Sequence, residues 1–169
     1  MARKTPSFNS SNLLVRDGAG EYGPAKADQV LQAAQQLLMR KLEGSDVLSS
    51  PQAARDFLRV KLGALEHEIF AVLMLDAQHR VIEYVELFRG TVSQTSVYPR
   101  EVVKESLARN AAALILVHNH PSGVADPSRA DELLTKTLAA ALQLIDVAVV
   151  DHIIIAGSSL FSFAERGLL

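Results

Sequence analysis

The stretch AAALILVHNHPSG, residues 111–123, joins an apolar run to two histidines and a turn. The run at residues 111–117 has the length and composition of a fully buried strand. Side chains two residues apart in a strand point to the same face, so His118 and His120 can converge while Asn119 points away. Proline and glycine then end the strand and turn the chain. We therefore expect a buried strand with two imidazole side chains at its C-terminal end.

A carboxylate follows the two histidines at the start of a predicted helix. Apolar residues with helical spacing follow Ser128, and Asp131 would lie in the first turn, where the helix dipole favours an anion. Two histidines and one carboxylate, with a fourth position open, form the ligand set of a catalytic zinc site. The sequence therefore predicts that His118, His120 and Asp131 hold one Zn²⁺ per chain.

The same residues have a purely structural interpretation. Ser128 and Asp131 show the Ser-x-x-acid spacing of a capping box, although that box usually contains Glu or Gln. The two histidines would then be ordinary residues at the end of a strand. Because all the candidates fall within residues 118–131, we favour a metal site in which Ser128 both caps the helix and serves the site.

A zinc hydrolase also needs a general base, and two glutamates stand in a suitable place. Glu66 and Glu68 directly precede a second apolar run, residues 69–75. A carboxylate at the entrance to a core is costly unless it is paired or functional. The alternative is that both are solvated residues after a helix, and the residues alone do not choose between the two glutamates.

Several separated motifs, in a fixed order, resemble the RadC-like JAB domains over roughly residues 50–169. These domains belong to the JAB/MPN superfamily, whose metal-dependent members include isopeptidases that release ubiquitin-like modifiers. The matching motifs are Glu68-Ile69-Phe70, Leu75-Asp76, Phe88-Arg89-Gly90-Thr91, Tyr98-Pro99-Arg100-Glu101, His118-Asn119-His120-Pro121-Ser122-Gly123, Pro127-Ser128 with Asp131, and Asp151-His152-Ile153-Ile154.

The resemblance implies a role for each matching residue. Glu68 matches the glutamate that acts as general base on metal-bound water, which selects it from the pair of glutamates. His118, His120 and Asp131 match the metal ligands. Ser128 matches the serine that hydrogen-bonds the substrate carbonyl oxygen as charge develops. The implied protein is a zinc-dependent hydrolase that cleaves a peptide or isopeptide bond in a peptide, a protein or a modifier-conjugated protein.

Two other functions stay open as alternatives. One is a non-catalytic binding module on the JAB fold, against which the complete ligand set argues. The other is a DNA-repair accessory protein, as the family name implies. Longer RadC-like proteins carry a helix-hairpin-helix DNA-binding domain, but this chain shows no such signature and resembles the short members. Its net charge of -2 and pI of about 6.2 also make nucleic acid an unexpected partner.

Composition sets further bounds. At 169 residues the chain has the length of one domain with a single core. It has no cysteine, which excludes disulfides, thiolate catalysis, Cys-ligated zinc and the zinc deaminases with their Cys pair. No apolar segment has the length of a membrane span. We therefore expect a cytoplasmic protein.

The N-terminal part divides into two segments. Residues 1–23 are polar, and we expect a loosely packed arm. Residues 24–48 predict a helix that begins at Pro24 and ends at Gly44. We expect its apolar face to pack on the core, the alternative being a docking surface that forms a homodimer. That face comprises Ala27, Val30, Leu31, Ala34, Leu37, Leu38 and Leu42.

Residues 49–169 are predicted to form the JAB/MPN metallohydrolase domain. Helices are expected after a cap at Ser50, from Pro99 and after Pro127, and strands at residues 69–75, 81–91, 111–117, 147–156 and 160–163. Because the first two strands form a hairpin and helices alternate with strands afterwards, we expect an α/β (α+β) fold. It would have a mixed central β-sheet flanked by helices on both faces. The resemblance implies the three-layer, cytidine-deaminase-like form of this fold.

His152 lies inside the apolar strand predicted at residues 147–156. We interpret it as a buried, hydrogen-bonded histidine. The alternative, which the family resemblance suggests, is that it lies behind the metal ligands and supports them.

Overall fold

Five strands form a mixed sheet in the order β4-β3-β5-β6-β7. The computed structural model describes residues 13–43, 45–47, 51–91 and 96–169. Strands β5 and β6 are parallel and the other neighbours are antiparallel, so the predicted mixed sheet and its first hairpin, β3–β4, are confirmed. The strands are β3 (Ile69–Leu75), β4 (Val81–Arg89), β5 (Ala113–Asn119), β6 (Ala148–Ala156) and β7 (Ser159–Ser162).

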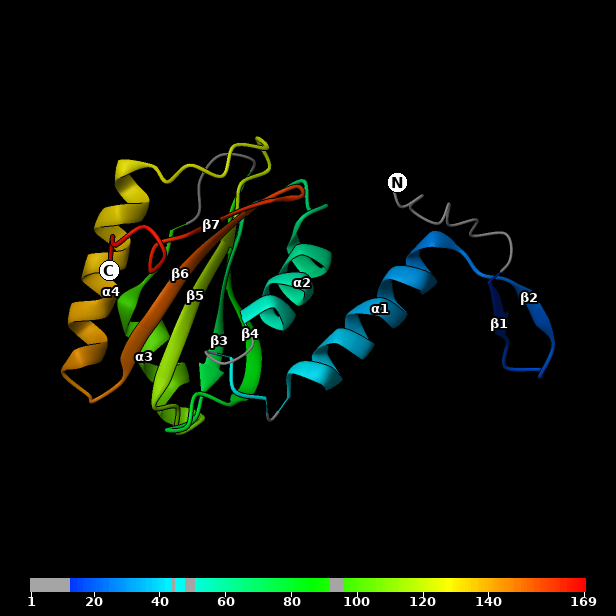
Figure 1. The fold of residues 1–169 in the computed structure, drawn as a ribbon, viewed down its shortest axis with the longest axis horizontal. Coiled ribbons are helices and arrows are strands. Elements are labelled where there is room, and N and C mark those ends of the chain that lie inside the picture. Colours follow the sequence, from blue (N-terminus) through cyan, green and yellow to red (C-terminus); the bar gives the residue numbers. More distant parts are fainter. Residues whose placement is uncertain (1–12, 44, 48–50, 92–95) are drawn as a thin grey trace, which may run out of the picture.

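Helices cover both faces of this sheet, which confirms the predicted fold class (Figure 1). Helix α2 (Pro51–Leu62) packs on one face, and α1 (Ala27–Leu42) lies against α2. Helices α3 (Pro99–Ala108) and α4 (Arg129–Gln143) lie side by side on the other face. The result is three layers, with α1 outside the layer that α2 forms (Figure 1).

The central strand β3 is apolar throughout because it serves two cores. Ile69, Ala71, Leu73 and Leu75 pack toward α2, and Phe70, Val72 and Met74 pack toward α3 and α4. Strand β5 alternates in the same way, with Ile115 and Val117 on the α2 side and Leu114 and Leu116 on the other. This alternation places His118 on the face that α4 covers, where it stacks on Phe70.

The segment predicted as a polar arm contains a β-hairpin. Strand β1 (Leu14–Arg16) pairs with β2 (Tyr22–Pro24), and Asp17 Oδ1 accepts from two backbone N–H groups in the connecting turn. The predicted helix start at Pro24 is therefore wrong: Pro24 pairs opposite Leu14, and α1 begins at Ala27. Pro24 is itself the last residue of β2, so it cannot be the first residue of the helix.

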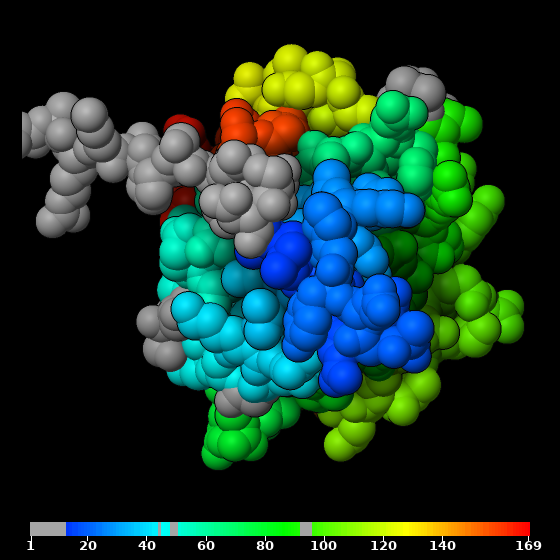
Figure 2. Space-filling model, turned by 90° about the vertical axis from the view of Figure 1, so that its right-hand side faces the viewer, coloured from blue at the N-terminus to red at the C-terminus, as the bar shows by residue number. Residues whose placement is uncertain are grey.

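Helix α1 is most deeply buried at its C-terminal end. Leu42 is fully buried in the core and Leu38 and Met39 pack against it, whereas Leu31 and Leu37 are 48% and 63% exposed. The predicted packing face is thus confirmed for Leu38 and Leu42 and wrong for Leu31 and Leu37. Figure 2 shows the molecule from the side that lies at the right in Figure 1. From there, the β1–β2 hairpin and the first turns of α1, both blue, form the outermost layer.

Some predictions fall outside the described residues: most of the arm, the helix end at Gly44 and the cap at Ser50. Within the described part of the chain, no helix is long and apolar enough to cross a membrane.

Candidate metal centre

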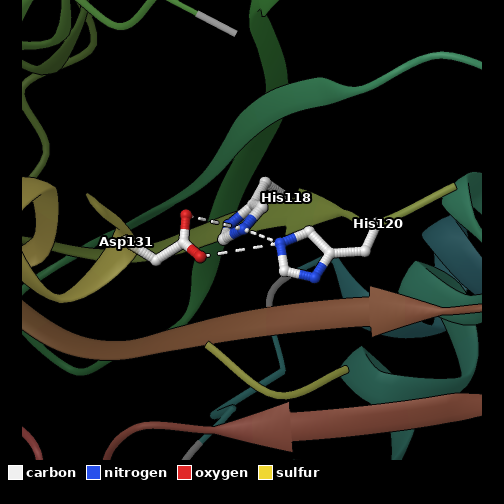
Figure 3. Close-up of side chains that lie close together, drawn as sticks. All are labelled: His118, His120 and Asp131. Atoms are coloured by element: carbon white, nitrogen blue, oxygen red, sulfur yellow. Dashed lines mark hydrogen bonds and ion pairs between the residues drawn. The ribbon is translucent and has the colours of Figure 1, made fainter. Parts of the chain in front are cut away.

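Three side chains that the sequence singled out meet at one end of the sheet. His118 lies near the end of β5, His120 follows the strand, and Asp131 lies in the first turn of α4. The backbone N–H of His120 donates to the carbonyl oxygen of Ile155 on β6 (2.8 Å), which extends the pairing past the end of β5. All three side chains point toward one another (Figure 3).

The distances between them match a site for one ion. His118 Nε2 lies 3.3 Å from Asp131 Oδ1, His120 Nε2 lies 3.6 Å from Asp131 Oδ2, and the two Nε2 atoms are 2.9 Å apart. One ligand atom from each residue can be chosen so that all lie within 4.8 Å of one another. The group of His118, His120 and Asp131 could therefore hold a metal ion.

The capping box that served as the structural alternative is also present. Ser128 Oγ accepts from the backbone N–H of Asp131 (3.2 Å), and Asp131 Oδ2 accepts from the backbone N–H of Ser128 (2.7 Å). The carboxylate thus caps α4 and faces the histidines at the same time. The two interpretations do not exclude each other, because the cap fixes the rotamer that aims the carboxylate into the site.

The charges of these residues support this arrangement. Burial opposes ionisation of Asp131, but hydrogen bonds with His118 and His120 outweigh it and hold the pKa of this carboxyl well below its usual range. The hydrogen bond with Asp131 in turn raises the pKa of His120, against the effect of burial. A permanent negative charge therefore lies beside two imidazoles, which favours a cation.

The ligand atom of His120 is fixed by a neighbouring carbonyl. His120 Nδ1 lies 2.8 Å from the backbone oxygen of Val124, and a carbonyl oxygen can only accept. Nδ1 must carry a proton, so Nε2 is the nitrogen of His120 that can offer a lone pair to a metal ion, and it faces Asp131 and His118. Imidazole nitrogens and a carboxylate oxygen are the donor types that zinc takes, so these residues fit a zinc ion.

Behind the site, His152 is fully buried and touches a candidate ligand. Its Nε2 lies 2.8 Å from His118 Nδ1, and its Nδ1 lies 2.6 Å from Thr135 Oγ1. The ring stacks on Phe163 and meets Phe70 edge-on. The structure therefore confirms a buried, hydrogen-bonded histidine, and this histidine also supports His118. Thr135 was missed by the sequence analysis.

The two glutamates differ in their surroundings. Glu68 is half-buried. Its backbone N–H donates to the carbonyl oxygen of Thr91 (2.9 Å), and its own carbonyl oxygen accepts from the backbone N–H of Gly90 (2.8 Å). Its negative charge contributes to raising the pKa of His120, after larger contributions from Asp131 and Val124. Glu66 is exposed and lines a pocket of about 240 Å³ that also borders His120.

Asn119 points away from the histidines, as the strand alternation predicts, and ties the glutamate segment to β5. Its Oδ1 accepts from the backbone N–H of Ile69 (2.8 Å), and its Nδ2 donates to the carbonyl oxygen of His67 (2.9 Å). These two bonds bracket Glu68. The backbone position of Glu68 is thus set by the same strand that carries the two histidines.

The sequence model of the RadC-like JAB domain matches residues 48–168. The chain belongs to this family. The resemblance found in the motifs is therefore confirmed, and the family match covers every residue of the site.

Relatives in this family are similar over nearly the whole chain. A UPF0758 protein of Leptothrix cholodnii is 62% identical, over 93% of this chain and 74% of its own length. UPF0758 proteins of Methylibium petroleiphilum and Aromatoleum aromaticum are 59% and 57% identical, over 94% and 96% of this chain and 75% and 76% of their own lengths. These names state no activity.

Proposed function

We propose that this RadC-like JAB domain protein is a zinc-dependent hydrolase that cleaves a peptide or isopeptide bond. The observation that carries the proposal is the convergence of two imidazole nitrogens and an ionised carboxylate at one strand end, with ligand atoms within 4.8 Å of one another. Three protein ligands are the number that leaves a position open for chemistry at zinc.

His118, His120 and Asp131 are the residues that would hold the zinc ion. The ion would supply a Lewis acid that polarises a carbonyl and lowers the pKa of water toward neutrality. The proposal assigns the proton transfers to the protein: Glu68 takes a proton from the attacking water and returns it to the leaving amine. Its half-buried position and fixed backbone support this assignment over the exposed Glu66.

Ser128 is assigned the stabilisation of the developing oxyanion. Its oxygen accepts from Asp131 N–H, which uses a lone pair and leaves the hydroxyl proton for a substrate oxygen. Ser128 is exposed at the helix N-terminus, where the dipole of α4 favours negative charge. An amide carbonyl in a peptide or isopeptide bond develops charge of this kind on its oxygen when it is attacked.

Metal content tests the first half of the proposal. Elemental analysis of the purified chain should find about one zinc per chain, and the variants His118→Ala and Asp131→Ala should have almost none. A parent chain without metal, which takes up none on dialysis against zinc, would contradict the metal centre. The capping box and two structural histidines would then describe this end of the sheet.

A matched pair of variants tests the second half. With peptides fused to a ubiquitin-like modifier as substrates, Glu68→Gln should bind zinc normally and lose about 10²- to 10⁴-fold in kcat. Glu66→Gln, two residues away and exposed, should keep full activity. Equal activities for the two variants would overturn the assignment of the base. Zinc binding without any hydrolysis would favour a binding module.

A further inference from the structure

The segment that carries Glu68 has no regular secondary structure of its own. Helix α2 ends at Leu62 and β3 begins at Ile69, so residues 63–68 form the connection between them. On one side, the backbone of Glu68 bonds to the chain that follows β4. On the other side the segment faces β5, and there a side chain holds it instead of a second strand.

Asn119 provides this side chain at the point where β3 and β5 stop pairing. The ladder between the two strands ends at the pair of Phe70 and His118. Strand β5 stays paired with β6 for one residue more. In an unbroken ladder, the backbone N–H of Ile69 would bond to a backbone carbonyl of β5. It bonds instead to Oδ1 of Asn119 (2.8 Å).

The side-chain amide of Asn119 also reaches the residue before Glu68. Its Nδ2 donates to the carbonyl oxygen of His67 (2.9 Å). One amide thus supplies an acceptor to Ile69 and a donor to His67, and no carboxylate could do both because it has no donor. Asn119 is 2% exposed, so water does not compete for these bonds. We refer to the two bonds as the Asn119 clamp.

The clamp sets the face of the sheet toward which Glu68 projects. Phe70 lies on the face that α4 covers, and side chains two residues apart in an extended chain share a face. Glu68 therefore projects toward the face that carries His118. Continuing the register of β3 and β5 by two residues would place Glu68 opposite His120. Among the described residues, Glu68 is nevertheless outside the group whose ligand atoms lie within 4.8 Å of one another.

We propose that Asn119 is a positioning residue for Glu68. Its amide occupies the place where the two strands separate and holds residues 67–69 against β5, so that Glu68 faces the two histidines without joining them as a ligand. This role deepens the proposed function and rests on it, because only that function makes Glu68 a general base. Asn119 itself contacts neither metal nor substrate in this role, so its loss should act through the base alone.

Amide hydrogen exchange tests the clamp without any enzyme activity. In protein treated with a chelator, Asn119→Ala should speed exchange of the Ile69 and Glu68 amides by about 10-fold, as expected when a hydrogen bond that holds the segment is lost. The amide of Val72, in the middle of β3, should keep its parental rate. If Asn119→Ala does not fold, Asn119→Asp gives the same comparison, because it keeps the acceptor and loses the donor. Parental exchange at Glu68 in the folded variant would overturn the proposal.

A cycle of single and double variants tests the consequence for catalysis. Asn119→Asp should lower kcat in the modifier-peptide assay by about 10²-fold at parental zinc affinity, because the base is displaced. In the Glu68→Gln background, where the base is already lost, the same change should leave kcat unaffected. Asn110→Asp is the matched control, because Asn110 is exposed in the turn before β5, and it should behave like the parent. An equal loss of kcat in both backgrounds, or a loss of zinc, would make Asn119 a merely structural residue.

The two measurements separate this proposal from the one on which it rests. Faster exchange at Glu68 in a protein that hydrolyses no substrate would support the clamp and reject the hydrolase alone. Parental exchange in the variant of an active hydrolase would reject the clamp alone.

Discussion

At the scale of single residues, His152 is a titratable side chain enclosed in a core, and it couples stability to pH. Its folded pKa lies well below the value of about 6.5 expected in an unfolded chain. As the pH falls below about 6.5, His152 takes up a proton in the unfolded chain before it does so in the folded one. The stability that the neutral, buried His152 contributes is therefore present above that pH and is lost below it. His120 acts in the opposite direction, because its folded pKa is raised, but it is partly exposed and so contributes less.

We therefore expect the free energy of unfolding of the metal-free protein to decrease between about pH 7.5 and pH 5. Urea titrations at several pH values measure this slope, and the window stays above the range in which Asp131 would lose its contribution. The slope should be smaller in His152→Gln. A slope that is the same in parent and variant would assign the pH dependence to other groups.

The candidate ligands could be predicted from the sequence because their chemistry follows short spacings. His118 and His120 are two apart on a strand, and Asp131 has a capping position relative to Ser128. Thr135 could not be predicted in this way. Its partner His152 lies 17 residues away on β6, and a threonine on the buried side of a helix has no local pattern that reveals a histidine opposite.

At the scale of elements, the N-terminus of α4 combines a cap with a proposed catalytic hydroxyl, and one substitution separates them. Glycine at an N-cap costs only a few tenths of a kcal/mol relative to serine. Ser128→Gly should therefore leave the free energy of unfolding almost unchanged, while kcat falls by about 10²- to 10³-fold because the oxyanion donor is lost. Denaturant unfolding and the modifier-peptide assay measure the two effects. An unchanged kcat in Ser128→Gly would make Ser128 a cap alone.

The strands and their faces could be predicted, whereas the ends of helix α1 could not. An unbroken apolar run such as residues 69–75 has few alternatives to a strand buried on both sides, and the structure confirms it. The proline at residue 24 satisfied the rule for a helix start, but its pairing with Leu14 on the opposite strand prevailed. That pairing depends on a turn around Asp17, whose side-chain bonds no periodicity shows.

At the scale of the whole molecule, Leu42 at the end of α1 anchors this helix in the core, and two leucines of the helix test that attachment. Leu42 is fully buried, so Leu42→Ala should destabilise the protein by about 2–5 kcal/mol. Leu37 is 63% exposed, and Leu37→Ala should change stability by less than about 0.5 kcal/mol. Denaturant unfolding at two protein concentrations provides the comparison. A large, concentration-dependent loss in Leu37→Ala would instead indicate a dimer formed through this face.

The closed path of hydrogen bonds and one ion pair through Asp131, Thr135, His152 and His118 also has a consequence for motion. Fraying of the first turn of α4 would break the cap, the bond to Thr135 and the carboxylate's contact with the histidines together. An ion bound to both the helix and β5 would therefore resist the local opening of this turn, because the open form could no longer bind it with all three ligands. Exchange of the amide hydrogens in the first turn of α4 would then be governed by metal occupancy, and the end of a helix, normally the first part to open, would become one of the last.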